Sequence, residues 1–146
     1  MMPFVKVYIH FVWSTKNRQP FLKTPEIRKK VWQHMRENAV VKGIFIDFVN
    51  GYYEHCHCLV SIGKKQTIEK VIQLIKGESS FWINKQKLCK EYFEWQDEYF
   101  AVSVSESRID LVRNYIKNQE EHHQHKTFQE EYDEFMKKYG FEKFKD

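Results

Sequence analysis

The sequence has 146 residues, which is enough for one domain with a buried core and short for two. A composition of 42% hydrophobic and 16% aromatic residues excludes an intrinsically disordered chain, because disordered segments are poor in aromatic side chains. The net charge of +4 permits a polyanionic partner without identifying one. No apolar run approaches the roughly 18 residues of a membrane span, and the first residues lack the pattern of a signal peptide. We therefore expect a cytoplasmic protein without a membrane partner.

The first part of the chain has the pattern of a strand followed by a helix. Residues 5–13 alternate between apolar and polar side chains, which predicts a half-buried strand. Thr24 is a helix-capping residue, and Pro25 suits the first position of the helix that follows. We expect this helix to end at Gly43.

A hairpin and a second helix are predicted next. Residues 44–48 and 56–62 have the composition of strands, and Asn50-Gly51 between them is a strong signal for a chain reversal. Thr67 then begins a helix whose apolar residues recur at helical spacing towards Trp82.

The last elements are a strand over residues 100–104 and a helix that begins at Ser103 or Ser105 and continues through Ile116. The order β-α-β-β-α-β followed by a helix predicts an α+β, ferredoxin-like fold with an antiparallel sheet. We expect one domain, with the functional part over residues 1–125. The charged tail over 126–146 should hold a short surface helix within the same domain. Because this fold hosts many functions, only particular side chains can identify the activity.

A pair of histidines marks the third predicted strand. His55 and His57 are two residues apart, so their imidazoles should lie side by side on one face of the strand and could bind one metal ion. Cys56 and Cys58 should point to the opposite face. The alternative interpretation is a pair of surface or hydrogen-bonded histidines without a metal.

A zinc finger is the competing metal hypothesis. The spacing of the cysteines departs from that of structural zinc sites, and their odd number also argues against a disulfide framework. The residues on which a zinc finger would draw are Cys56, Cys58, Cys89, His122, His123 and His125.

A tyrosine lies on the last predicted helix. Ile109, Val112 and Ile116 define the apolar stripe of this helix, which places Tyr115 at the edge of the core and Gln119 one turn later on nearly the same line. The alternative interpretation is a boundary tyrosine whose ring is packed and whose hydroxyl is in water.

Together these segments resemble the single-tyrosine HUH transposases of small insertion sequences, the IS200-like family, including the transposases associated with repetitive extragenic palindromes (REP). The resemblance covers almost the whole chain, and Cys56 stands where the family has a bulky hydrophobic residue between the two histidines. Besides the paired histidines, it rests on residues 11–16, 76–80, 95–99 and 115–123.

The resemblance implies a transposase that cleaves and rejoins single-stranded DNA at hairpin-marked sites through a 5′-phosphotyrosine intermediate. Tyr115 would be the nucleophile, His55 and His57 would bind Mg²⁺ or Mn²⁺, and Gln119 would be the third metal ligand. Carboxamide oxygen and imidazole suit these ions. Asn118 or Glu120 could replace Gln119 if the helix register differs.

The expected partners are a DNA hairpin with flanking single strand and a second copy of the chain. Excision of an element needs cuts at two ends, while each chain has one such tyrosine, so a homodimer is expected. Whether the tyrosine acts on its own subunit's histidines or on its partner's stays open. No nucleotide cofactor is expected, because the chain lacks a Gly-rich nucleotide loop.

Basic and aromatic side chains are candidates for DNA contacts, although a surface lysine usually only solvates and a tryptophan is more often in the core. Trp82 and Trp95 could stack on unpaired bases. Candidates for phosphate contacts are Lys16, Arg18, Lys64, Lys65, Lys76, Arg108 and Arg113.

Two alternative functions remain. The first is a non-catalytic nucleic-acid-binding module on the same fold, although the chain lacks the aromatic strand motif of RNA-recognition modules. The second is a domesticated REP-associated relative that cuts chromosomal palindromes without moving an element.

Overall fold

The computed structural model describes residues 3–141 and has four strands in one antiparallel sheet. The sheet order is β2-β3-β1-β4, in which β1 lies between β3 and β4. This confirms the predicted α+β, ferredoxin-like fold. The elements that form its β-α-β-β-α-β core are β1 (Val7–Ser14), α1 (Pro25–Val41), β2 (Phe45–Gly51), β3 (His55–Ile62), α2 (Ile68–Lys85) and β4 (Phe100–Val104).

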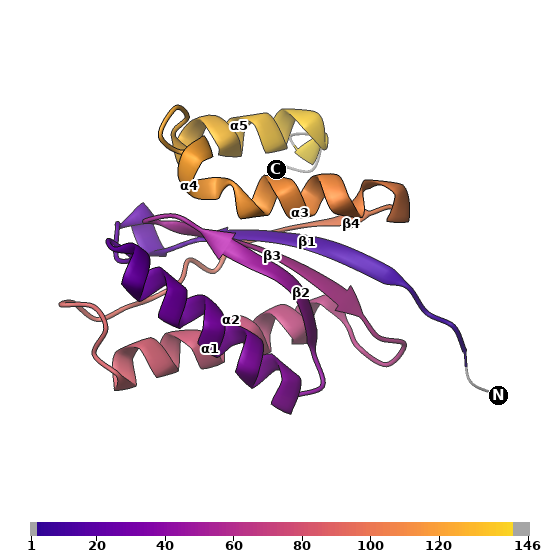
Figure 1. The fold of residues 1–146 in the computed structure, drawn as a ribbon, viewed down its shortest axis with the longest axis horizontal. Coiled ribbons are helices and arrows are strands. Elements are labelled where there is room, and N and C mark those ends of the chain that lie inside the picture. The colour runs from indigo at the N-terminus through magenta and orange to yellow at the C-terminus, as the bar shows by residue number, and fades with distance from the viewer. Residues whose placement is uncertain (1–2, 142–146) are drawn as a thin grey trace.

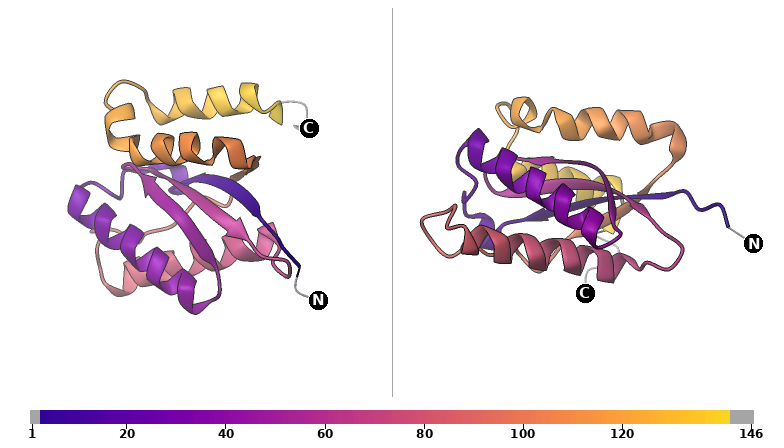
Figure 2. Two further views of the ribbon diagram at one scale, coloured as in Figure 1. Left: turned by 45° about the vertical axis from the view of Figure 1, so that its right-hand side comes forward. Right: turned by 60° about the horizontal axis from the view of Figure 1, so that its bottom comes forward.

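Helices cover both faces of the sheet, as Figures 1 and 2 show. Helices α1 and α2 lie on one face. The other face is covered by the last part of the chain, with α3 (Ile109–Lys117), the short α4 (Gln119–His122) and α5 (Phe128–Lys138). Short 3-10 turns at Lys16–Arg18 and Glu106–Arg108 follow β1 and β4.

The predicted helix starts are confirmed at α1 and α2. The hydroxyl of Thr24 accepts a hydrogen bond from the backbone N–H of Ile27 at 3.2 Å, and that of Thr67 accepts one from Lys70 at 3.1 Å. Each hydroxyl thereby satisfies one of the backbone donors that a helix leaves unpaired at its first turn.

Strand β1 is buried on both faces, whereas its alternating pattern predicts a half-buried strand. Phe11 and Trp13 pack into the large core under α1 and α2. On the opposite face His10 and Val12 are only 4% and 2% exposed, because α3 and α5 cover them. The expectation of one solvated face is therefore wrong, since the covering helices come from the distant end of the sequence.

The predicted hairpin is present, but its turn lies after Asn50-Gly51. Both residues belong to β2, and the chain reverses over 52–54, where Tyr52 N–H donates to the carbonyl of His55 at 3.1 Å. A Cβ on Gly51 would lie 2.1 Å from that carbonyl oxygen, so the close approach of the strands requires glycine. Asn50 donates instead to the carbonyls of Ile116 and Lys117, both at 3.0 Å, and so binds the end of α3.

The C-terminal helix α5 packs against the sheet, whereas the sequence suggests a surface helix. Thr127 and Glu130 form a capping box at its start. Its buried residues include Phe128, Glu131 and Phe135, which lie on one side of the helix. Residues 142–146 of the predicted tail lie outside the described part. Within the described part, no helix is long and apolar enough to cross a membrane.

Candidate active site

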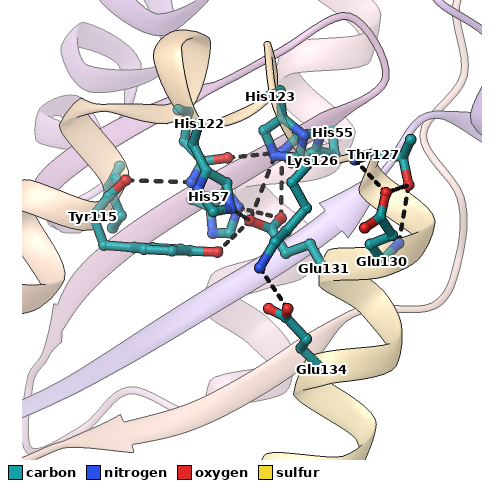
Figure 3. A network of polar contacts seen from close by, with 12 residues as sticks. His55, His57, Tyr115, His122, His123, Lys126, Thr127, Glu130, Glu131 and Glu134 are labelled. Carbon is teal, nitrogen blue, oxygen red and sulfur yellow. Dashed lines mark hydrogen bonds and ion pairs between the residues drawn. The ribbon is translucent and has the colours of Figure 1, made fainter.

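The two histidines of β3 lie side by side on the face covered by α3 and α5. Both side chains are fully buried, with 0% exposure, and their Nε2 atoms face the C-terminal helices (Figure 3). Cys56 and Cys58 belong to the core on the opposite face. The strand geometry predicted from the spacing of the histidines is thus present.

The other ring nitrogen of each histidine has its own hydrogen-bond partner. His55 Nδ1 lies 2.7 Å from Glu54 Oε1, and His57 Nδ1 lies 2.9 Å from His10 Nε2. If a cation binds, protons on the Nδ1 atoms would keep these hydrogen bonds to Glu54 and His10 and leave the Nε2 lone pairs to the cation. Metal-binding histidines commonly have such an outer partner.

Gln119 lies where the sequence predicts it, next to His55. Its Oε1 is 2.9 Å from His55 Nε2, and its amide Nε2 donates to the carbonyl of Tyr115 at 3.2 Å. Of the two suggested replacements, Glu120 instead pairs with Arg28 at 2.8 Å, and Asn118 is exposed at the end of α3. The helix register therefore favours Gln119.

Glu131 of α5 lies at the centre of the site, although sequence reasoning did not select it. The carboxylate is fully buried, and its Oε1 is 2.9 Å from His57 Nε2 and 3.5 Å from His55 Nε2. The sequence held one signal: Glu131 interrupts an apolar stripe formed by Phe128 and Phe135. An acid at such a position must be buried beside polar partners.

The hydroxyl of Tyr115 donates a hydrogen bond to Glu131 Oε2, and its ring centroid is 5.5 Å from that of His57. The helix that carries Tyr115 is held to the sheet from two sides. Asn50 binds its last carbonyls, and Arg113 forms a bidentate pair with Asp47 at 2.7 Å for both contacts. Tyr115, the predicted nucleophile, therefore lies beside His55 and His57 of its own chain.

The ionisation of the site follows from its burial. Burial lowers the pKa of His57 below its ordinary value and lowers that of His10 to about 3, so both rings are neutral near pH 7. Burial alone would raise the pKa of Glu131, but the neighbouring His57 and His123 hold it well below its usual range. Burial and then the charge of Glu131 raise the pKa of the Tyr115 hydroxyl. The tyrosine is therefore protonated unless a positive charge comes near it.

These side chains fit a divalent cation. The donors are two imidazole nitrogens, one amide oxygen and one carboxylate oxygen, all on residues with 0% exposure. Within residues 3–141, His55, His57 and Glu131 form one of two groups whose ligand atoms lie within 4.8 Å of one another. Oxygen donors suit Mg²⁺ or Mn²⁺, and the imidazoles favour the transition metal of the two.

The zinc-finger hypothesis is wrong, because the structure separates its residues. Cys56 and Cys58 are buried on the face under α1 and α2, while His122 and His123 lie over the other face. Cys89 is half-buried beside the carbonyl of Phe21. The sheet thus stands between the thiols and the histidines.

The basic residues suggested for DNA contacts divide into two sets. Lys64, Lys65 and Arg108 are exposed, with no ion pair to a described residue. The others have protein partners: Lys16 pairs with Glu94, Arg18 stacks over Phe128 and Tyr132, Lys76 donates to the carbonyls of Gln96 and Asp97, and Arg113 pairs with Asp47 and Asp110.

The two tryptophans suggested for base stacking both pack against other side chains, Trp95 in the core and Trp82 partly buried beside it. Trp95 is 7% exposed and donates its indole N–H to Ser79 at 2.9 Å. The ring of Trp82 stacks on His34 with the centroids 4.0 Å apart. Trp95 in particular cannot stack on a base, because its ring belongs to the core.

Comparison with solved structures supports the same fold. A protein from Deinococcus radiodurans R1, solved as a candidate transposase, has a TM-score of 0.65 and 22% identity, with 82% of this chain and 95% of that chain covered. A REP-associated tyrosine transposase bound to a REP hairpin has a TM-score of 0.60 and 16% identity, with 84% and 72% covered. At these identities the likeness establishes the fold alone.

Among curated protein sequences, none matches this chain. The family model for IS200-like transposases matches residues 3–119, which is most of the sequence and includes the paired histidines, Tyr115 and Gln119. The match ends before Glu131. The chain belongs to the IS200-like transposase family.

Proposed function

We propose that this transposase cleaves and rejoins single-stranded DNA at hairpin-marked sites, with Tyr115 as the nucleophile. The observation that carries the proposal is the meeting of Tyr115 with the histidine pair. The tyrosine hydroxyl and His57 Nε2 contact the two oxygens of one buried carboxylate, Glu131. A phenol, two imidazoles and a carboxylate in one water-poor site form the set that metal-assisted phosphoryl transfer needs.

His55, His57, Gln119 and Glu131 would hold a divalent cation, Mg²⁺ or Mn²⁺. When bound there, such a cation would offset the negative charge of the phosphate oxygens and would favour the ionised phenol. Glu54 and His10 orient the two imidazoles from behind through hydrogen bonds at 2.7 and 2.9 Å. Gln119 also binds the backbone of Tyr115, so the same side chain positions the cation site and the tyrosine helix.

In the proposed step, Tyr115 Oη attacks the phosphorus, and the bond from phosphorus to the 3′-oxygen breaks. The phenol proton, which is held in a hydrogen bond to Glu131 Oε2 before the attack, is released to water. The departing 3′-oxygen takes a proton from water, which leaves a 5′-phosphotyrosine and a free 3′-hydroxyl. The phosphotyrosine keeps the energy of the broken bond, so another 3′-hydroxyl can reseal the strand without a nucleotide cofactor.

The substrate class is single-stranded DNA next to a hairpin, by analogy with the REP hairpin in the solved relative. Among the basic residues suggested from the sequence, Lys64, Lys65 and Arg108 are exposed and free to contact phosphates. Two cuts require two tyrosines, so we propose a homodimer. In this dimer, Tyr115 of each subunit acts with the two histidines of the same subunit.

The decisive experiment uses labelled single-stranded DNA with the hairpins from either side of its own gene. After incubation with Mg²⁺ or Mn²⁺, denaturing electrophoresis should show a protein-linked product. Tyr115→Phe should lower adduct formation by at least about 10³-fold, because it removes the nucleophile. His57→Ala and chelation of the metal should also abolish the product.

Tyr92→Phe is the matched control, because Tyr92 is 72% exposed and distant from the histidines in sequence. It should form the adduct at the wild-type rate. Hairpin binding without any adduct in the wild type would overturn the proposal in favour of a non-catalytic binding module. Cleavage restricted to chromosomal palindromes would identify a domesticated enzyme with the same chemistry.

A further inference from the structure

A second group of metal-binding side chains lies beside the histidine pair and is not needed for the proposed function. His122 at the end of α4 and His123 just after it point at Glu131 (Figure 3). Their Nε2 atoms are 3.5 Å and 3.4 Å from Glu131 Oε2. Within residues 3–141, this trio is the second group whose ligand atoms lie within 4.8 Å of one another.

These two imidazole nitrogens have no hydrogen-bond partner among the described residues. Both Nε2 atoms are buried, and neither makes a hydrogen bond of acceptable geometry to any described residue. The side chain of His123 is only 2% exposed, while that of His122 is 26% exposed. Because a buried polar atom without a partner destabilises the protein, such atoms usually have an unseen ligand or a functional role.

Glu131 can serve both groups at once. Its Oε1 faces His57 and His55, whereas its Oε2 faces His122, His123 and the Tyr115 hydroxyl. A carboxylate that presents one oxygen to each of two groups has the arrangement of a bridging ligand between two cations.

We propose that His122, His123 and Glu131 bind a second cation, a late first-row transition ion of the zinc class. Two imidazoles and one carboxylate form a donor set found in zinc enzymes, with positions left for water. Imidazole donors favour zinc over Mg²⁺, so this site differs in preference from the amide-containing site at His55 and His57. The side chains that build it follow residue 119, where the family match ends.

The second site goes beyond the proposed function and can be tested without DNA cleavage. The full chain, freed of metal and dialysed against Zn²⁺, should retain two equivalents by elemental analysis. The double variant His122→Ala/His123→Ala should lose one equivalent and keep the other. The double variant His55→Ala/His57→Ala should likewise keep one.

His125→Ala is the matched control, because His125 lies in the same turn but is exposed. It should retain both equivalents. The proposal is overturned if the wild type binds a single equivalent, or if His122→Ala/His123→Ala binds as much zinc as the wild type. A protein that does not cleave DNA should still bind two equivalents of zinc. The test of the second cation site is therefore independent of the test of DNA cleavage.

A measurement on the unmodified protein covers the case in which the double variant does not fold. With two equivalents of Mn²⁺, ions that share Glu131 should give a magnetically coupled electron paramagnetic resonance signal. With two equivalents of Mn²⁺ shown to be bound by elemental analysis, the ordinary six-line signal of isolated Mn²⁺ would contradict a shared carboxylate.

Discussion

The two faces of the sheet carry different side chains, although the same strands form both. Under α1 and α2 the buried side chains are almost entirely apolar, with Phe11 and Cys58 at 0% exposure. Under α3 and α5, two apolar clusters flank a group of buried polar residues. The residues of this group with at most 4% exposure are His10, His55, His57, Gln119 and Glu131.

This difference shows where stability and activity separate in the molecule. Apolar burial stabilises a fold without further conditions, whereas a buried carboxylate or imidazole needs a partner to offset its lost hydration. On the polar face these partners are the other site residues. Metal and pH should therefore change stability through the polar face, whereas substitutions in the apolar face should change stability without changing metal affinity.

The largest expected effect on stability comes from the apolar face. Phe11→Ala should lower the free energy of unfolding by about 3–5 kcal/mol, because it leaves a cavity in the core. Urea unfolding measures this loss. Val7→Ala, on the same side of β1 but with Val7 44% exposed, should change stability little. The folded Phe11→Ala protein should bind metal with normal affinity. A loss of affinity would show that the apolar core also controls the metal site.

Metal should stabilise the protein through the polar face alone. Mn²⁺ at a hundred times its dissociation constant should raise the free energy of unfolding by about 2.7 kcal/mol for each occupied site. Thermal melts with Mn²⁺ and with EDTA measure the difference. Phe11→Ala should keep this increment, whereas His57→Ala should lose the part that belongs to the histidine pair.

Acid should destabilise the metal-free protein through its buried neutral histidines. Burial lowers the folded-state pKa of His10 from 6.5 to about 3, so below pH 6.5 the unfolded chain binds the extra proton. Stability should fall by about 1.4 kcal/mol per pH unit for this group between pH 6 and 4.5. His57, whose pKa is also lowered, adds to the fall with the same sign.

The lowered pKa of Glu131 acts in the same direction, but only below about pH 4.5, where the unfolded carboxylate takes up its proton. His10→Gln keeps a polar side chain beside His57 and removes the titration. The pH dependence of urea unfolding with EDTA should therefore become shallower by about one proton. An unchanged slope in His10→Gln would assign the acid sensitivity elsewhere.

The smallest expected effect on stability comes from the contact between β2 and the tyrosine helix. Asn50→Ala removes two hydrogen bonds to the end of α3 and should cost about 1 kcal/mol. Adduct formation should fall further than this loss of stability explains, because Tyr115 is less well positioned. Asn114→Ala, on the exposed side of the same helix, is the control and should leave the adduct rate unchanged.

The fold and part of the site could be predicted from local patterns. The strand at β1, the caps at Thr24 and Thr67, and the helical spacing in α2 depend on neighbouring residues, and each is present in the structure. The half-buried state expected for β1 is not, because burial of its second face depends on helices from the far end of the chain. The common face of His55 and His57 follows from strand geometry in the same way. Asn50-Gly51 does not form the turn that its sequence predicts, because both residues extend β2 and Asn50 binds the end of α3.

The sequence by itself determined the order of elements, because periodicity acts over short distances. It also determined the family, and the family resemblance marked Tyr115, His55, His57 and Gln119 as candidate site residues. Only the tertiary structure decided that α5 covers the second face of the sheet and brings Glu131 between Tyr115 and His57. It also decided that His10 supports His57 and that Trp95 lies in the core. These contacts join residues far apart in the chain, and packing between elements sets them.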